Sequence, residues 1–197
     1  MDTSGWLKAA RLALIRGGPS AVRVEILARD LKVTKGSFYW HFKNREHLLE
    51  TLLREWESES EQLFREVAAR SHTGDALQFL GEYIQKSMSS PPGEYPPDVG
   101  IFNWAATDRK VAARVNRIER IRIDTLVKLT GHPDRVELVY LVWLGFIFRR
   151  HRSPGTAEDL PFIWNSVADF LSVPPEEDRR QERIVYPTRK KRRKAHD

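Results

Sequence analysis

The sequence predicts an all-α protein. Apolar residues recur at helical spacing along most of the 197-residue chain, and no stretch of useful length alternates between apolar and polar residues. Prolines interrupt the helical pattern at 91–97 and at 174–175, which marks a long loop and a boundary. Hydrophobic residues make up 41% of the chain and charged residues 30%, a composition that favours a packed core over a disordered or collagenous chain.

The N-terminal part of the chain contains four predicted helices. Gly17-Gly18-Pro19 ends the first of them. Thr34 can cap the third, because its hydroxyl can accept hydrogen bonds from the first turn. Asn44 begins the fourth, which extends toward Gly74. In order, the four helices are predicted at about 6–15, 23–31, 35–42 and 44–67.

Five further helices follow, predicted at about 75–88, 100–107, 109–130, 134–150 and 157–172. In the segment 134–150, apolar residues surround the helix and leave no polar stripe, so this helix must be covered on all sides. Two interpretations stay open. It is either the central helix of a core, or a helix shared between the core and a second subunit.

The net charge of +6 is concentrated at the two ends of the chain. Residues 1–56 carry 10 basic and 6 acidic side chains, residues 57–173 carry 14 and 16, and residues 174–197 carry 9 and 5. A basic terminal region beside a mildly acidic body is typical of a nucleic-acid-binding module on a larger scaffold. Ordinary surface variation would give the same numbers, so charge alone does not decide.

The third predicted helix has two different faces. At about 100° per residue, Phe38 and Phe42 lie on one side and can anchor the helix, while Tyr39, Trp40 and Lys43 lie on the other. An outward Tyr-Trp pair is unfavourable unless something covers it.

Polar groups gather at the start of the same helix. Thr34, Lys35 and Ser37 place donors at the helix N-terminus, where anions are favoured, and Gly36 permits close approach of another backbone or a phosphate. Two short helices with a tight turn and such a face indicate a helix-turn-helix. The alternative is a plain helical hairpin with buried aromatic residues.

The segment from Val33 to Arg45, VTKGSFYWHFKNR, strongly resembles the recognition-helix signature of the TetR family of transcriptional regulators. Arg23–Leu31 is similar to the helix that precedes it, and the resemblance covers about residues 6–53. Lys32 departs from the pattern, because the family usually has Gly in this turn. If the turn is left-handed, a Lys there costs about 1 kcal/mol or more.

The resemblance implies a three-helix, helix-turn-helix DNA-binding domain at 1–50 and a helical effector-binding and dimerisation domain at 51–173. It also implies that one set of residues contacts double-stranded DNA: Thr34, Lys35, Gly36, Ser37, Tyr39, Trp40, His41, Lys43 and Arg45.

Different roles are expected within this set. Tyr39, Lys43 and Arg45 would contact phosphates, whereas Lys35 and Trp40 would reach base edges or thymine methyl groups in the major groove. Thr34 and Ser37 would donate to phosphates or bases, and Gly36 would allow the approach. His41 is expected either to contact a phosphate or to form a structural hydrogen bond.

For the larger domain, the resemblance implies a homodimer built from 134–150 and 157–172, which would fix the spacing of two recognition helices on a palindromic operator. A small-molecule effector would bind among the helices between 56 and 150. The candidate ligand-binding residues are Phe102, Asn103, Trp104, Tyr140 and Trp143. The function expected is that of a repressor released by an effector. An activator and a ligand-independent or architectural DNA-binding protein stay as alternatives.

An enzyme is the rival class, and the sequence offers no catalytic set for it. The chain has no Cys, its six His are not spaced as a metal pair, and it has no glycine-rich phosphate loop. We therefore expect no catalytic residue, no cofactor and no metal.

The segment 174–197 is expected to be a basic, disordered tail, because it is poor in apolar residues and rich in like charges. Its run Arg189–Lys194 is either an additional DNA-binding arm or simply solvated. Those six residues account for the net charge, since 27 basic and 27 acidic residues remain without them. The N-terminus lacks signal-peptide features, and the apolar run 138–148 is too short to cross a bilayer. We expect a soluble, cytoplasmic protein with no membrane contact.

Overall fold

The computed structural model of the chain describes residues 2–90, 96–153 and 160–172, and every regular element within them is a helix. The all-α prediction is confirmed. In chain order the helices are α1 (Thr3–Ala21), α2 (Val24–Asp30), α3 (Lys35–Tyr39), α4 (Arg45–Ala68), α5 (Thr73–Ser89), α6 (Asp98–Ala105), α7 (Arg109–Thr130), α8 (Pro133–Arg152) and α9 (Leu160–Ser172).

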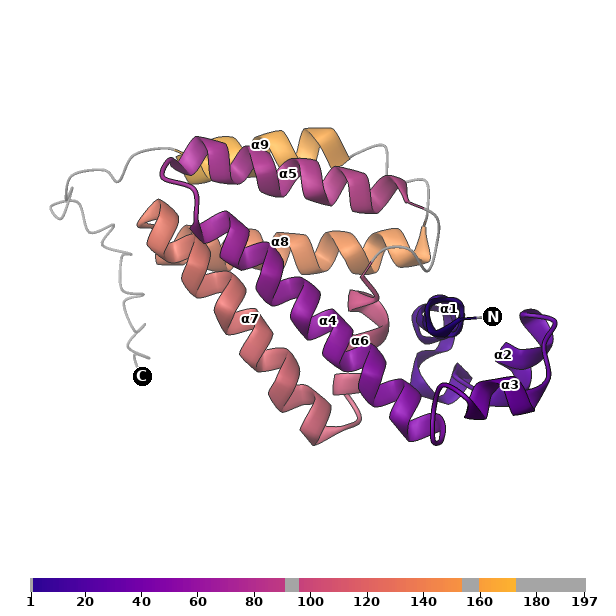
Figure 1. Ribbon diagram of the computed structural model, residues 1–197. Helices are drawn as coiled ribbons and strands as arrows, with labels where there is room; N and C mark the ends of the chain where they lie inside the picture. Colours follow the sequence, from indigo (N-terminus) through magenta and orange to yellow (C-terminus); the bar gives the residue numbers. More distant parts are fainter. Residues whose placement is uncertain (1, 91–95, 154–159, 173–197) are drawn as a thin grey trace, which may run out of the picture.

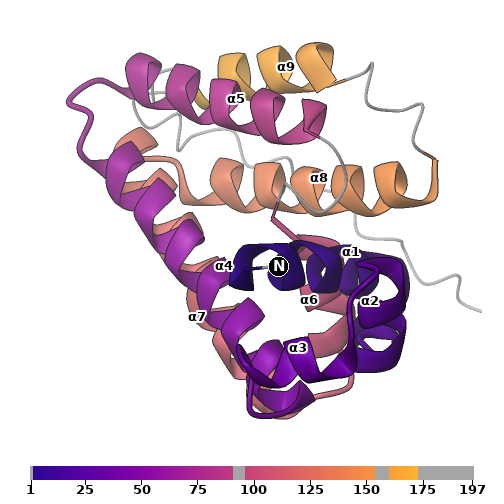
Figure 2. The ribbon, with the colours of Figure 1, turned by 45° about the vertical axis from the view of Figure 1, so that its right-hand side comes forward.

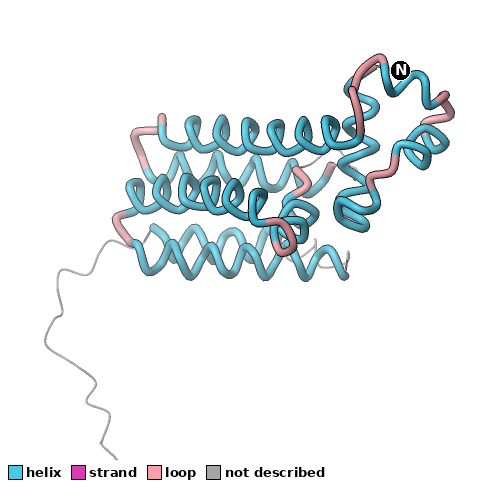
Figure 3. The backbone as a smooth tube through the Cα atoms, turned by 90° about the horizontal axis from the view of Figure 1, so that it is seen from below, coloured by secondary structure: helices cyan, strands magenta, loops and turns pink. Residues whose placement is uncertain are grey.

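The helices form an N-terminal unit of α1–α3 and a larger helical body, with α4 running from one into the other (Figure 1). Helix α7 packs along α4, and α8 lies between this pair and the pair formed by α5 and α9 (Figure 2). Seen from below, α1–α3 project at one end of the body (Figure 3). The N-terminal unit is therefore free to present one surface outward.

The buried apolar residues form two clusters. The first joins α1–α3 to the first half of α4, to α6 and to the beginning of α7. The second fills the space between the end of α4 and helices α5, α7, α8 and α9. Trp56 on α4 belongs to the first cluster and is fully buried. The N-terminal core thus extends past residue 50, because α4, α6 and α7 supply part of it.

Helix α1 continues past its predicted end. Gly17 and Gly18 have non-helical backbone angles, with φ of +67° at Gly18, and Pro19 then starts a final helical turn that ends at Ala21. The prediction that Gly17-Gly18-Pro19 stops the helix is wrong in this respect: the motif kinks it. Glycine adopts the positive φ without steric cost, and proline is well suited to the first position of the new turn.

The turn between α2 and α3 contains one residue in the left-handed conformation. This residue is Lys32, with φ of 57°. The following helix is shorter than predicted, since α3 ends at Tyr39 and not at residue 42. The carbonyl of Phe38 accepts hydrogen bonds from the N–H groups of both His41 and Phe42, which closes a tight turn and still places Phe42 in the core.

Helix α6 fits closely against α1. A Cβ atom added to Gly100 would lie 2.6 Å from the carbonyl oxygen of Leu14, so only glycine allows this approach. Neighbouring Ile101 is fully buried in the N-terminal cluster. The larger body is therefore in direct contact with the N-terminal unit through α6 as well as through α4.

Two expectations fall partly or wholly outside the described residues. The predicted helix 157–172 corresponds to α9, which is described from Leu160 onward, and the predicted tail 174–197 with its run 189–194 lies beyond the described part. None of the helices described is both long enough and apolar enough to span a membrane.

Candidate nucleic-acid interface

Aromatic residues on the buried side of α3 anchor this helix to the core. Phe38 is fully buried and packs edge-on against Trp6 of α1 at a centroid distance of 5.3 Å, and Phe42 stacks on Phe38 at 5.4 Å. At its start, Thr34 Oγ1 accepts a hydrogen bond of 3.3 Å from the N–H of Ser37, the predicted N-cap. The predicted anchoring role of the two phenylalanines is confirmed.

The opposite side of α3 exposes its two other aromatic residues. Tyr39 is 61% exposed and Trp40 is 88% exposed. A large indole with this exposure is costly in water, so the surface favours a partner that covers it. Both side chains follow directly on the buried Phe38, which fixes the backbone that carries them.

The first turn of α3 combines an ion pair with open space. The ammonium of Lys35 donates to Glu25 of α2 at 2.9 Å, and this exposed hydrogen bond lowers the pKa of Glu25. At Gly36, an added Cβ would make only an ordinary contact of 3.6 Å with Thr34 Oγ1, so packing within the protein does not demand glycine there. Ser37 is half-buried, and its N–H is already used by the cap.

Two polar residues after α3, His41 and Lys43, make different contacts within the protein. Lys43 has an exposed side chain, and its backbone N–H donates to His47 Nδ1 at 3.2 Å. His41 Nδ1 lies 3.1 Å from Thr3 Oγ1, a structural hydrogen bond to the beginning of α1. Of the two roles expected for His41, this contact supports the structural one.

Arg45 has a structural role that the sequence did not reveal. Its guanidinium donates to the carbonyl of Val22 at 2.7 Å and to the carbonyl of Pro19, and it lies 3.5 Å from the carboxylate of Glu46. It therefore ties the start of α4 to the last turn of α1 and to the residue that follows it. Nothing in the local sequence signals this contact, because its partners are backbone atoms about 25 positions away.

The five candidate ligand-binding residues do not lie together. Tyr140 and Trp143 of α8 line a cavity of about 110 Å³ in the larger body. Phe102, Asn103 and Trp104 are not among the residues that line it.

Their location in α6 gives the reason. Phe102 packs between Trp56 and Phe148, at centroid distances of 6.3 and 6.4 Å, and Trp104 packs against the N-terminal cluster. The side chain of Asn103 is on the exposed side of the helix.

Sequence reasoning missed the polar residues of the cavity, which are Ser60 of α4, Asp98 of α6 and Arg122 of α7. Arg122 donates to Ser60 Oγ at 2.8 Å and to Asp98 Oδ1 at 3.0 Å. One signal was present: Arg122 falls four residues after Ile118 and four before Leu126 on the buried stripe of α7. A charged residue at such a position requires a buried partner.

Comparison with known proteins identifies the N-terminal unit. Residues 7–52 match the family described as "Bacterial regulatory proteins, tetR family". No curated protein matches the chain. Among solved structures, the chain is similar to a transcriptional regulator described as TerR/AcrR family from Aquifex aeolicus VF5, with a TM-score of 0.58 and 18% identity. That match covers 85% of this chain and 95% of the other and shows a shared fold. The matched segment runs from α1 through α2 and α3 into the first turns of α4, so the N-terminal unit of the chain carries a DNA-binding domain of the tetR family.

Proposed function

We propose that the protein acts as a homodimer that binds a palindromic DNA site through α3 and represses transcription until a small molecule releases it. The observation that carries the proposal is the exposed pair Tyr39 and Trp40 over the buried Phe38. Exposed aromatic side chains of this size are unfavourable in water, and contact with DNA would remove that cost. The tetR-family match covers the same residues.

The proposed contacts are those expected from the sequence. Lys35 and Trp40 read base edges, and Tyr39 and Lys43 bind phosphates, with Thr34, Ser37 and Gly36 lining the approach. Lys35 must exchange its ion pair with Glu25 for a contact with DNA, which is inexpensive because the pair is exposed. Arg45 and His41 serve mainly to position the others, on the evidence of their hydrogen bonds within the protein.

An exposed apolar face on α8 and α9 supports the proposed dimer. Its members are Leu138, Leu141, Val142, Phe162 and Phe170, and Phe162 is 76% exposed. On a monomer this surface would favour association, and a two-fold pairing of α8 and α9 would cover it. Such a pairing explains why the helix 134–150 is apolar on every side.

The cavity between α4, α5, α7, α8 and α9 supports a proposed effector site. Part of its lining comes from α4, which begins directly after the recognition segment, and part from Asp98 at the start of α6, which packs against α1. In the proposed dimer, a ligand that prefers a conformation in which the two DNA-binding units are not spaced to fit the operator would lower the population of the operator-bound form.

Selection from a random duplex pool followed by footprinting tests the proposal. The purified protein should enrich a palindromic sequence and protect a bounded site on it, and Trp40→Ala should lose the protection while keeping the helical circular dichroism of the parent. Transcription from a promoter overlapping that site should fall when the protein is added. Uniform protection of any duplex would contradict sequence-specific binding, and increased transcription would contradict repression.

A further inference from the structure

The cavity of the larger body has apolar walls and one polar end. Its walls come from five helices and include Phe64, Leu80, Ile84, Leu126, Trp143 and Leu160. The polar end brings together Ser60, Asp98, Arg122 and Tyr140, each from a different helix. Because the walls are mostly hydrocarbon, a ligand that fills the cavity must be mostly apolar, and the end with the charged residues is the most favourable place for its polar group.

At the polar end the charges of the protein are already balanced. Arg122 is 8% exposed, and its guanidinium is paired with Asp98 at 3.0 Å, while Trp56 Nε1 donates to the same carboxylate oxygen at 3.1 Å. Burial raises the pKa of both Tyr83 and Tyr140, so these phenols stay neutral. Among the described lining residues, Asp98 and Arg122 are thus the only charged groups, and they neutralise each other.

This balance selects against a charged ligand. A carboxylate would compete with Asp98 for Arg122 and leave the largely buried Asp98 with only the neutral indole N–H of Trp56 as a partner. An ammonium group would be repelled by Arg122, and its own charge would be buried without a free counter-ion. What the site does lack is an acceptor, because the Nε–H of Arg122 is buried and has no hydrogen-bond partner. A buried donor of this kind is costly until an acceptor meets it.

We propose that the cavity binds an uncharged, largely apolar molecule with one hydrogen-bond acceptor, such as a ketone or an ester, which lies at Arg122. The proposal rests on the effector-controlled function proposed above and defines the chemistry of the effector. Since Asp98 is the first residue of α6, the polar group of the ligand meets the helix that packs against α1.

Calorimetric titration of the full-length protein with three eight-carbon probes at pH 7.5 tests the proposal. 2-Octanone should bind with one molecule per chain, and octanoate and octylammonium should bind about tenfold more weakly or not at all, because each buries an unpaired charge. Octanoate or octylammonium binding as tightly as the ketone would overturn the proposal.

Variants locate the binding and its donor. Val139→Phe fills the cavity from α8 and should abolish 2-octanone binding. Gln78→Phe adds a similar volume at an exposed position of α5, outside the cavity lining and the proposed dimer face, and should leave binding unchanged. Arg122→Lys keeps a cation beside Asp98 but removes the Nε–H, and it should weaken 2-octanone about fivefold or more. Circular dichroism confirms that each variant is folded. Binding that survives Val139→Phe in a folded variant would place the probe elsewhere and overturn the assignment.

A separate DNA-binding measurement distinguishes the two proposals. Protein that protects a bounded palindromic site but binds no 2-octanone overturns the ligand assignment and leaves DNA recognition intact. Protein that binds 2-octanone as described but protects no defined site overturns the proposed function and leaves the cavity chemistry standing.

Discussion

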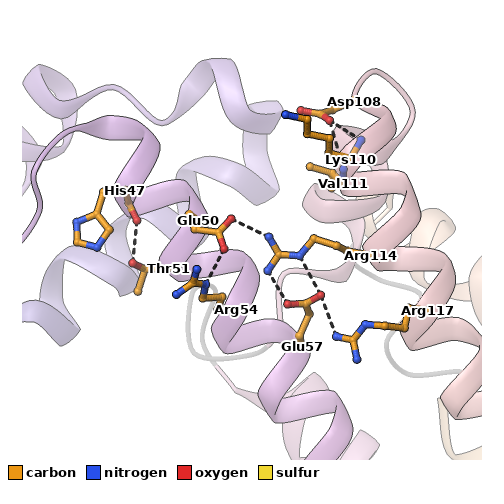
Figure 4. Close-up of polar contacts among 10 residues, drawn as sticks. All are labelled: His47, Glu50, Thr51, Arg54, Glu57, Asp108, Lys110, Val111, Arg114 and Arg117. Atoms are coloured by element: carbon orange, nitrogen blue, oxygen red, sulfur yellow. Dashed lines mark hydrogen bonds and ion pairs between the residues drawn. The ribbon is translucent and has the colours of Figure 1, made fainter.

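Arg114 of α7 holds the carboxylate of Glu57 of α4 with two hydrogen bonds, from Nε at 2.9 Å and from a terminal nitrogen at 2.5 Å (Figure 4). The third nitrogen of the same guanidinium donates to Glu50 at 2.7 Å, and Arg117 adds a contact to Glu57 at 3.0 Å. A bidentate pair of this kind fixes distance and orientation together. These contacts therefore fix the position of α7 against the N-terminal half of α4, the half that packs on the DNA-binding domain.

Replacing Glu57 by Gln should lower the free energy of unfolding by about 2 kcal/mol, because Arg114 and Arg117 lose the charge that compensates them in a largely buried place. Chemical denaturation at pH 7 measures this. Glu61→Gln is the matched control, since Glu61 lies one turn further along α4 and pairs only with arginines that are about half exposed or more. It should cost less than about 1 kcal/mol.

The same contacts make stability depend on pH. Hydrogen bonds from Arg114, and then from Arg117, hold the pKa of Glu57 below its ordinary value of 4.5 in the folded protein. The stabilisation is therefore complete above pH 4.5 and is lost as the pH falls through the lower, folded-state pKa. Glu57→Gln should flatten this acid limb of the stability curve. An unchanged limb would contradict the assignment.

Lys35 and Lys43 should respond differently to removal of their charge. Lys35→Ala is expected to change which sequences bind best, because its side chain lies at the first turn of α3, whereas Lys43→Ala should weaken all duplexes alike by removing a phosphate contact. Binding of both variants to the selected site and to random duplex, at two salt concentrations, measures the difference. Equal losses on both duplexes for both variants would refute the division of roles.

Arg45→Ala should reduce thermal stability as well as DNA affinity. Its guanidinium donates to the carbonyls of Val22 and Pro19, so truncation removes this donor from Val22 and leaves Pro19 with only the N–H of Val22, at a cost of about 1–2 kcal/mol. For a chain of this length that corresponds to a fall in Tm of roughly 2–8 °C. Lys43→Ala serves as the control and should leave Tm unchanged, as its side chain is exposed.

The sequence predicts best those features that depend on neighbouring residues. The expected helix 109–130 is confirmed as α7, Arg109–Thr130, because both of its ends are coded locally: Asp108 accepts hydrogen bonds from Lys110 and Val111, and Gly131 takes a left-handed conformation. The position of Phe38 and Trp40 on opposite sides of α3 follows in the same way from helical spacing.

Features that depend on distant partners were not predictable. The polar end of the cavity comes from Ser60, Asp98 and Arg122, which lie on three helices and meet only after α6 has packed. Helical periodicity reports which residues are buried, but it does not report which buried residues meet.

Gly100→Ala should destabilise the protein, although alanine is the better helix former. The new Cβ would lie 2.6 Å from the backbone oxygen of Leu14, and because backbone cannot rotate away as a side chain can, α6 and α1 must separate. We expect a loss of about 2 kcal/mol in unfolding free energy. Gly74→Ala in α5 is the control: nothing lies within 4 Å of its added Cβ, so it should be neutral or stabilise by about 0.5 kcal/mol. Equal stability of the two variants would show that α6 does not depend on this close approach.

Leu141→Glu should convert the proposed dimer into a monomer. Leu141 is 56% exposed on α8, so the substitution leaves the fold of one chain intact, but in a pairing of α8 and α9 it buries an unpaired carboxylate. The dissociation constant should rise about thirtyfold or more, the effect of losing roughly 2 kcal/mol at the centre of an interface. Sedimentation equilibrium measures it, and Ser71→Glu, which adds the same charge in the exposed loop before α5, is the control. Phe162→Glu on α9 should behave like Leu141→Glu, because both residues belong to the apolar face proposed as the dimer interface. If both variants dimerise as the parent does, the exposed apolar face of α8 and α9 does not form the dimer.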